Sequence, residues 1–344
     1  MQTVEILFIL TVVVVFIFDF TNGFHDAADM IATAIASKEI KTDIAVAIVG
    51  VFTFLGPIVA GVAVADTIGT FVDISGLDNT KAQITVISSL LAAVSYNLAT
   101  WKFGLPSSSS NSLAGGLVGA GLFMVGSGHI NWGLEALKEW HLEGLTKVFA
   151  GLFLSPFFGF IVGFIVIRLI IYIFKRFTMK IKPLFIATQY FTIAFLGFSH
   201  GANDAQKGMA IIAMMLLASG YTTSFEVPFW VILLCTSAIT LGTVFGGWSI
   251  IKTLGFELYP IKLIDSVANQ LSSAIINSFA THIGAPTSTT QVVTASLLGV
   301  GAAQKPRHVG WSRAFEIVIG WVVNVPISML LGAIYCFILT GVLK

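Results

Sequence analysis

Gly201-Ala202-Asn203-Asp204-Ala205-Gln206-Lys207 is a polar stretch in the middle of an apolar segment. Residues 188–198 before it and 208–218 after it carry no charged side chain. An ionised side chain at the middle of a bilayer costs at least ~2.5–3.5 kcal/mol, so one that persists there indicates an ion or substrate pathway. The stretch therefore predicts a functional site inside a membrane crossing. A short polar loop between two helices is the alternative.

The same pattern occurs twice in the chain. Residues 20–27, Phe-Thr-Asn-Gly-Phe-His-Asp-Ala, match residues 198–205, Phe-Ser-His-Gly-Ala-Asn-Asp-Ala, at an offset of 178 (204 − 26). Residues 104–111, Gly-Leu-Pro-Ser-Ser-Ser-Ser-Asn, match residues 284–291, Gly-Ala-Pro-Thr-Ser-Thr-Thr-Gln, at an offset of 180 (284 − 104). Two motifs at nearly one offset indicate an internal duplication. We expect a first repeat over 1–175, a basic cytoplasmic linker over 176–187 and a second repeat over 188–344.

The composition restricts the class of protein. Hydrophobic residues make up 56% of the chain and charged residues only 10%, which excludes a soluble globular domain of this length. The formal net charge of +1 argues against binding to nucleic acid. The chain is therefore predicted to be an all-α integral membrane protein.

The paired Gly-x-x-Asp motifs and the paired Pro-hydroxyl runs resemble the inorganic phosphate transporter (PiT) family, of the sodium/phosphate symporter type, whose signature is Gly-Ala-Asn-Asp. The resemblance covers the whole chain. It implies a homodimer in the inner membrane that imports phosphate with a cation gradient, with Na+ as the expected coupling ion and no covalent cofactor. The chain departs from the signature at Phe24-His25, at Asp29 where an Asn is usual, and at Gln206-Lys207. These departures leave the coupling ion open.

Hydrophobic segments predict about 12 helical pieces, because a crossing helix needs about 20 apolar residues. Residues 4–37 and 188–218 each contain an Asp motif and are predicted to be discontinuous crossings. Full spans are predicted at 44–64, 146–174, 228–249 and 314–339. The segments on either side of each hydroxyl run form either a re-entrant hairpin or two separate crossings.

The Lys and Arg residues favour the hairpin. Residues 175–182 and 304–313 are basic and contain no acid, and basic segments favour the cytoplasmic side. If each hydroxyl run is a hairpin tip, both basic segments are cytoplasmic, both termini lie outside and the two repeats are inverted. Discontinuous helices then meet at mid-membrane, as in many transporters. If each run joins two crossings, the repeats are parallel and residues 304–313 lie outside.

The hydroxyl runs predict an anion site. Pro106 and Pro286 precede the runs, and Pro followed by Ser or Thr is typical of a helix N-terminus. Free N–H groups, the positive end of the helix dipole and several hydroxyl donors would bind a small oxyanion there without an Arg. The expected phosphate ligands are Ser107, Ser108, Ser109, Thr287, Ser288, Thr289, His25 and His200. A flexible polar linker and packing roles for the His residues are the alternatives.

The carboxylates predict cation sites. Two carboxylates and a phosphate carry about −3 to −4, which must be neutralised at mid-membrane, and two or three Na+ would do so. The expected Na+ ligands are Asn22, Asp26, Asn97, Asn203, Asp204 and Asn277. A helix-capping role for the Asp residues is the alternative. Lys207 is placed one turn after Asp204, where it can pair with it.

Other functions remain open from the sequence. An H+-coupled phosphate or sulfate permease would differ only in its ion or anion. An anion channel would use the hydroxyl runs as a static filter, and the duplicated carboxylates count against it. A membrane-embedded hydrolase would need one Ser–His–Asp set, whereas the chain carries two near-symmetric copies. The chain is therefore predicted to be a transporter and not an enzyme.

The basic segments generate a topology prediction. Lys180→Cys and Lys305→Cys, each in a background without Cys235 and Cys336, are expected to resist an impermeant thiol reagent in intact cells, because both positions face the cytoplasm. Both should react once the membrane is permeabilised. Labelling of position 305 in intact cells would contradict the hairpin interpretation.

Overall fold

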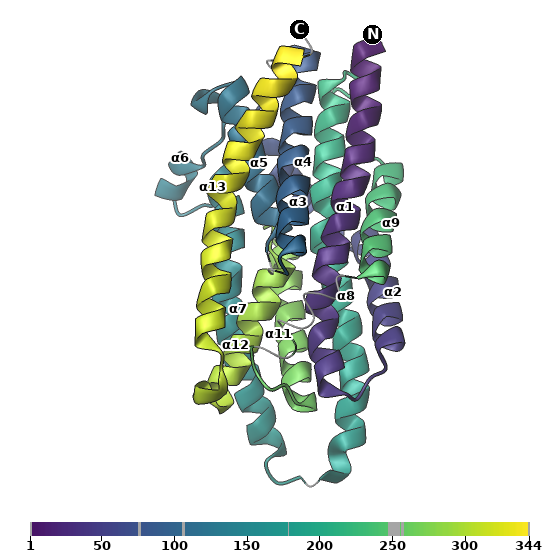
Figure 1. The fold of residues 1–344 in the computed structure, drawn as a ribbon, viewed down its shortest axis with the longest axis vertical. Helices are drawn as coiled ribbons and strands as arrows, with labels where there is room; N and C mark the ends of the chain where they lie inside the picture. Colours follow the sequence, from purple (N-terminus) through teal and green to yellow (C-terminus); the bar gives the residue numbers. More distant parts are fainter. Residues whose placement is uncertain are drawn as a thin grey trace.

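The computed structural model describes residues 2–74, 77–104, 107–177, 179–246, 255 and 258–342. This part of the chain is built almost wholly from α-helices (Figure 1). They are α1 (Gln2–Ser37), α2 (Thr42–Ala60), α3 (Ala63–Thr70), α4 (Asn79–Lys102), α5 (Ser109–Met124), α6 (Leu134–Lys138), α7 (Gly144–Phe174), α8 (Lys182–Ala218), α9 (Phe229–Phe245), α11 (Leu263–His282), α12 (Thr289–Gln304) and α13 (Trp311–Val342).

Several of these helices suit a membrane. Within the described residues α1, α2, α4, α7 and α13 are long and apolar enough to cross one, and α9 is a shorter apolar helix. Large apolar side chains point outward, such as Val59 at 70% exposure, Phe157 at 59% and Phe337 at 66%. Polar side chains of α1, α5, α8 and α12 are buried instead. This distribution is the one expected of a multi-pass membrane protein, in which lipid replaces water around the chain.

The Asp motifs do not interrupt their helices. α1 runs for 36 residues through Asp26, and α8 runs for 37 residues through Asp204. The prediction of discontinuous crossings at 4–37 and 188–218 is therefore wrong. A continuous helix satisfies its own backbone groups, so only the motif side chains need partners. Other helices supply those partners, and no break is required.

The chain does break at both hydroxyl runs. α4 ends at Lys102 and α5 begins at Ser109; α11 ends at His282 and α12 begins at Thr289. Gly104 and Gly284 follow the first helix of each pair with φ of +64° and +67°, a left-handed conformation that favours glycine at a helix end. Pro106 lies outside the described residues. Each run is thus the tip of a helical hairpin.

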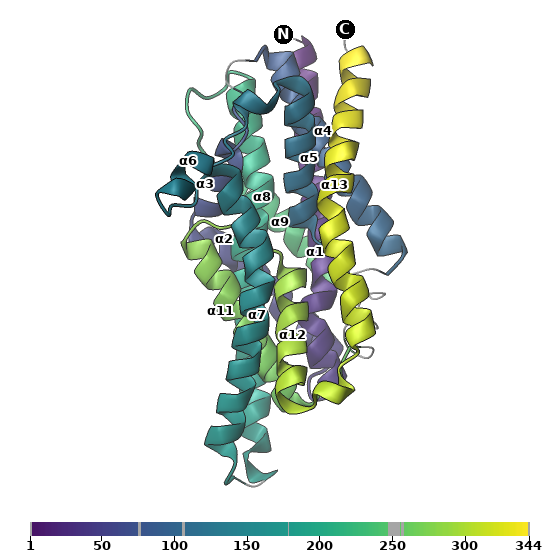
Figure 2. The same cartoon turned by 90° about the vertical axis from the view of Figure 1, so that its left-hand side faces the viewer.

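The two hairpins enter the molecule from opposite ends. α4–α5 occupies the upper half of Figure 1 and α11–α12 the lower half, with the tips near the middle, and Figure 2 shows the same separation. α1 starts at the top of Figure 1 and α8 at the bottom, so the two motif helices run in opposite directions. The loops of both hairpins therefore meet beside the central turns of α1 and α8.

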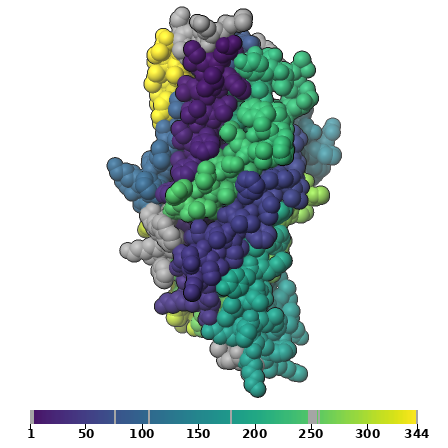
Figure 3. All heavy atoms as spheres, turned by 90° about the vertical axis from the view of Figure 1, so that its right-hand side faces the viewer, coloured from purple at the N-terminus to yellow at the C-terminus, as the bar shows by residue number. Residues whose placement is uncertain are grey.

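Helices of one half pack mainly on helices of the other. α2 lies on α8 and α9 on α1, while α5 lies on α13 and α12 on α7. The first four share one face, which Figure 3 shows in purple (α1), indigo (α2), teal (α8) and green (α9). The matching contacts use matching glycines: a Cβ at Gly23 would lie 2.0 Å from Ile239 O, and one at Gly201 would lie 2.1 Å from Thr53 O. The two halves are interlocked at backbone distance.

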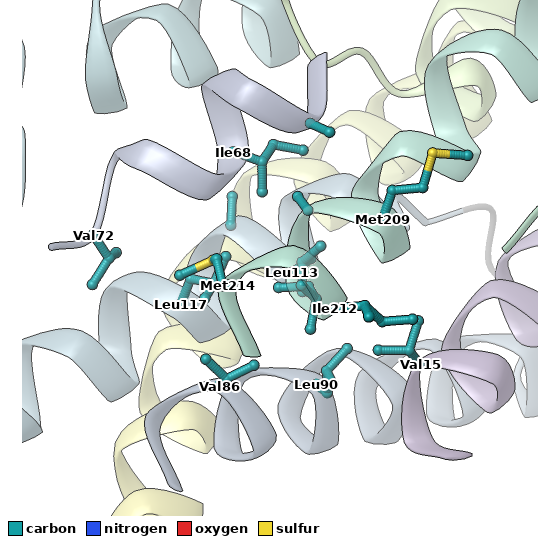
Figure 4. Close-up of a cluster of buried hydrophobic side chains, with 14 of the residues drawn as sticks. Val15, Ile68, Val72, Val86, Leu90, Leu113, Leu117, Met209, Ile212 and Met214 are labelled. Atoms are coloured by element: carbon teal, nitrogen blue, oxygen red, sulfur yellow. The ribbon is translucent and has the colours of Figure 1, made fainter. Parts of the chain in front are cut away.

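A buried apolar cluster holds the first hairpin in place (Figure 4). It joins Val15 of α1, Leu90 of α4 and Leu113 of α5 to Met209 and Ile212 of α8. All five side chains are at most 2% exposed. Because closely packed side chains leave little room to shift, this cluster fixes the position of the hydroxyl tip of α5 relative to α8.

The glycine contacts predict a stability difference between two matched substitutions. A Cβ at Gly299 of α12 would lie 2.1 Å from Phe160 O of α7, whereas one at Gly320 of α13 would meet no atom within 4 Å. Gly299→Ala is therefore expected to lower the free energy of unfolding by about 1–3 kcal/mol. Gly320→Ala should leave it unchanged or raise it by up to ~1 kcal/mol through helix propensity. Thermal denaturation in detergent measures both, and equal melting temperatures would contradict the close contact.

Candidate functional site

Four elements meet at one buried polar centre: the middle turns of α1 and α8 and the N-termini of α5 and α12. Asp26 is 2% exposed, and His200, Asp204 and Thr289 are fully buried. The sequence predicted that these motifs would converge, and the described residues do bring them within contact distance. What each side chain contacts differs from what its motif suggested.

The two hairpin tips have the same local structure. Ser108 and Ser288 are the N-cap residues of α5 and α12, with φ and ψ of −107° and 110° for Ser108 and −111° and 109° for Ser288. Their hydroxyl oxygens accept hydrogen bonds from Asn111 N at 3.1 Å and Gln291 N at 3.4 Å. Capping uses the hydroxyl oxygen as acceptor and leaves the O–H as a donor. Both helix N-termini therefore direct donors at the centre.

Asn203 and Asn277 hold the second tip. Asn203 accepts a hydrogen bond from Thr287 N at 3.0 Å and donates to Ala285 O at 3.2 Å and Thr281 Oγ1 at 2.9 Å. Asn277 accepts from Thr287 Oγ1 at 3.3 Å and donates to Thr289 Oγ1 at 3.2 Å. Both amides were predicted as cation ligands from the sequence. In this arrangement the amide oxygens face the hairpin.

The first tip is held in a different way. Ser109 donates to Asn22 Oδ1 at 2.5 Å, and Asn22 donates to Asp204 Oδ2 at 3.3 Å, so this amide joins the tip of one half to the carboxylate of the other. Asn97 accepts from Ser112 at 3.1 Å. Ser107 Oγ lies 2.7 Å from Thr100 Oγ1 of the preceding helix. Asn97 and Ser107 therefore bond within their own hairpin.

The carboxylates of the first half are bound by the hairpin of the second. Thr290 donates to Asp26 Oδ1 at 2.8 Å and also contacts Asp29 Oδ2. His25 Nδ1 lies 3.6 Å from Asp26 Oδ1. One ligand atom from each of His25, Asp26 and Asp29 can be chosen so that all lie within 4.8 Å, a spacing that suits a bound cation. Carboxylate oxygens are the ligands that hard cations prefer.

His200 lies between the two motifs. Its Nδ1 is 3.1 Å from Thr289 Oγ1, and 3.9 Å from both Asp26 Oδ2 and Asp204 Oδ1. His200, Asp26 and Asp204 also meet the 4.8 Å spacing. Within the described residues the Nε2 atoms of His200 and His25 have no hydrogen-bond partner. The two Asp motifs, far apart in sequence, thus share one imidazole.

Several residues of the centre were missed or left unassigned by sequence reasoning. The hydroxyl runs contain Thr290 and Ser110, but the sequence does not predict their contacts across the two halves; Ser110 donates to Thr287 O at 2.7 Å. In the sequence Asp29 stands out only as a departure from the family signature. Lys207 pairs with Asp204 as expected, with Nζ 2.6 Å from Oδ2. Asp19, fully buried on α1, was missed, although an acid inside an apolar run was signal enough.

The arrangement offers two kinds of chemistry at one place. Hydroxyl and backbone donors at two helix N-termini suit an oxyanion, and the grouped carboxylates suit cations. The side chains of the centre are buried, and a cavity of about 10 Å³ beside Ser110, Lys207 and Pro286 is barely large enough for one water. A second cavity of about 200 Å³, lined in part by Phe24, His25 and Trp101, extends to the edge of the polar centre.

Comparisons with known proteins agree on one family. The family model described as "Phosphate transporter family" matches residues 22–332. The chain is 39% identical over 341 residues to the "Probable low-affinity inorganic phosphate transporter" of Bacillus subtilis (strain 168), covering 97% of this chain and 98% of that protein. It is 37% identical over 328 residues to the protein of the same name from Rhizobium meliloti (strain 1021), covering 95% and 94%.

A solved structure has the same fold. "The sodium-dependent phosphate transporter" superimposes with a TM-score of 0.85 at 25% sequence identity and covers 97% of this chain and 99% of that chain. The proteins to which this chain is similar are transporters and not enzymes.

The contacts of Thr290 predict a second difference in stability. Thr290→Val leaves two buried carboxylates without their shared donor, and we expect the free energy of unfolding to fall by about 2–3 kcal/mol. Thr294, one turn later on α12, is the control, because its buried hydroxyl has no hydrogen-bond partner among the described residues. Thr294→Val should be neutral or slightly stabilising in thermal denaturation. Equal effects of the two substitutions would contradict the bridging role of Thr290.

Proposed function

We propose that this chain, which belongs to the phosphate transporter family, imports inorganic phosphate by coupling it to an inward Na+ gradient. The chain is a multi-pass membrane protein and a phosphate transporter. The proposal adds the coupling ion, the direction of phosphate transport and the residues that bind phosphate and Na+. The observation that carries it is the meeting of two hydroxyl tips and two Asp motifs at one buried centre. The sodium-dependent transporter of the same fold supports Na+ as the ion.

Phosphate is proposed to bind between the two tips. Ser109 and Thr289 already face the central polar groups, and the N-cap hydroxyls of Ser108 and Ser288 lie one residue before them. Ser107, Thr287, His25 and His200 complete the proposed set. Because the donors come from opposite halves, an anion bound here would hold the two hairpins together. Rotation of the tips then becomes coupled to occupancy of the site.

Cations are proposed to bind at the carboxylates. Asp26 and Asp204 would act with the amides of Asn22, Asn97, Asn203 and Asn277, of which Asn22 contacts a carboxylate directly. A phosphate dianion beside buried carboxylates is unstable unless positive charge accompanies it. Two or three Na+ would compensate this charge. Binding of the cation and the anion is thereby cooperative, which is the physical basis of symport.

Transport requires the closed centre to open on alternate sides. We propose that residues 1–175 and 188–344 are inverted repeats joined by the cytoplasmic segment 176–187, with both termini outside. The opposite directions of α1 and α8 and the opposite entry of the hairpins support this reading (Figure 1). Matching helix pairs between the halves would let one set of contacts loosen while the other closes. The inner-membrane location and a homodimer are proposed from the family resemblance alone.

An H+-coupled permease is the second candidate. His200 lies between Asp26 and Asp204, where an imidazole could carry a proton between two carboxylates. Uptake driven by a pH gradient in the absence of Na+ would favour this candidate. A channel is a weaker reading, because the polar side chains of the centre are buried and bonded to one another across the two halves.

Reconstituted protein tests both ion and anion. In proteoliposomes an inward Na+ gradient, with choline as the control cation, is expected to drive accumulation of labelled phosphate. The accumulated amount should be at least about 10-fold above the control, a ratio that corresponds to 1.4 kcal/mol of driving force. Excess arsenate should block this uptake, whereas sulfate at the same concentration should not. Hydrogen phosphate and hydrogen arsenate have an O–H group that can donate a hydrogen bond to a carboxylate such as Asp26, and sulfate has none.

Two outcomes would contradict the proposal. Equal uptake in Na+ and choline would exclude Na+ as the coupling ion. Equal inhibition by sulfate and arsenate would make the protein a general oxyanion carrier.

A further inference from the structure

The two halves of the centre carry different charges. At the offset of 178, Asp26 corresponds to Asp204 and Asp29 corresponds to Lys207 (29 + 178 = 207). The position one turn after the motif carboxylate is thus an acid in α1 and a base in α8. The pair Asp26 and Asp29 has a formal charge of −2, and the pair Asp204 and Lys207 has a formal charge of zero. The duplication therefore does not make two equal cation sites.

Lys207 is placed as a fixed counterion. Its side chain is fully buried, and its Nζ donates to Asp204 Oδ2 at 2.6 Å. The same oxygen accepts from Asn22 at 3.3 Å, and Asp204 Oδ1 accepts from Thr289 at 3.4 Å. Both oxygens of this carboxylate thus have donors, and one of the donors carries a full positive charge. A short hydrogen bond between ionised groups is among the strongest that a protein forms.

The first half lacks such a group. Asp26 and Asp29 share the neutral hydroxyl of Thr290, and the other close polar neighbours of Asp26 are His25 and His200. Asp29 is fully buried, and its Oδ1 has no hydrogen-bond partner among the described residues. One oxygen of each acid and a ring nitrogen of His25 fit within 4.8 Å. Two adjacent carboxylates in a dry centre need a cation or a proton between them, and among the described residues no Lys or Arg forms an ion pair with Asp26 or Asp29.

From this asymmetry we propose that the Lys207 ammonium permanently fills the cation position of the second half, so that the mobile coupling cation binds at Asp26 and Asp29 with His25. The inference rests on the proposed cation-coupled transport; it keeps Asp26 as a ligand of the mobile cation and replaces the cation proposed at Asp204 with the Lys207 ammonium. One of the two positions that the duplication would otherwise offer to a mobile ion is closed by the protein itself. Asp26 and Asp204 then have different roles: Asp26 binds the ion that moves, and Asp204 holds Lys207 and the tip residue Thr289.

Binding of Na+ to the purified protein in detergent, without phosphate, tests the inference. The measurement is the dependence of the melting temperature on the logarithm of Na+ concentration at constant ionic strength with choline, since each added ion that binds the native state steepens this dependence. In Lys207→Met the freed Asp204 carboxylate becomes a second site, and the apparent number of bound Na+ is expected to rise by about one. Lys81→Met, an exposed change at the start of α4, is the control and should leave the dependence unchanged.

Asp29→Asn keeps the test valid if Lys207→Met folds poorly. It removes one charge of the first half and should weaken Na+ binding at least about 10-fold, equivalent to 1.4 kcal/mol. Asp204→Asn/Lys207→Met lacks the carboxylate that Lys207→Met frees, so its apparent number of bound Na+ is expected to be about one lower than in Lys207→Met. A double variant that binds as many Na+ as Lys207→Met, unchanged Na+ binding in Asp29→Asn, or an unchanged response in a folded Lys207→Met would overturn the inference.

The outcome separates this inference from the proposed function. If the unmodified protein ignores Na+ but Lys207→Met responds to it, the fixed counterion is supported and Na+ coupling is excluded. If the unmodified protein responds and Lys207→Met responds identically, Na+ coupling stands and the fixed counterion is excluded. If neither responds, Asp204 binds no cation even without Lys207, and the inference is wrong.

Discussion

The structure depends on the burial of charge at the centre of an apolar molecule. Asp26 and Asp204 are each at most 2% exposed and lie within long apolar helices, so their desolvation must be compensated by contacts from other elements. Hydroxyl groups of the second tip, the amide of Asn22, the imidazole of His200 and the ammonium of Lys207 provide these contacts. The requirement explains why two hairpins reach the middle of the molecule and stop there.

Close helix packing makes this arrangement possible. Glycines such as Gly23, Gly201 and Gly299 let helices of opposite halves approach to backbone contact, so that each half is held by the other. A substrate site built across such an interface changes shape when the halves move relative to each other. The same property suits alternating access, because two packings of the interface can exchange without unfolding either half.

Much of the fold could be predicted from the chain. The duplicated motifs, the apolar composition and the Pro-hydroxyl runs predicted an all-helical membrane protein with two hairpin tips at its centre. The prediction failed where it assigned a break to each Asp motif. Polar residues in a span can be satisfied by a broken backbone or by side chains of other helices, and sequence does not distinguish these solutions. Here Thr290 and Asn22 satisfy the motif carboxylates across the two halves, and α1 and α8 continue.

The sequence by itself determined which residue types would need partners inside the membrane, because burying an ionised carboxylate is unfavourable in any fold. It also determined that the polar motifs would be duplicated, since each motif recurs in the sequence at an offset of 178 or 180 residues. Only the tertiary structure decided the partners. Asn203, Asn97 and Ser107 bond to hairpin residues, whereas Thr290 bonds to Asp26 and Asp29. Contacts between residues more than 200 positions apart follow from how helices pack, and no local pattern encodes that geometry.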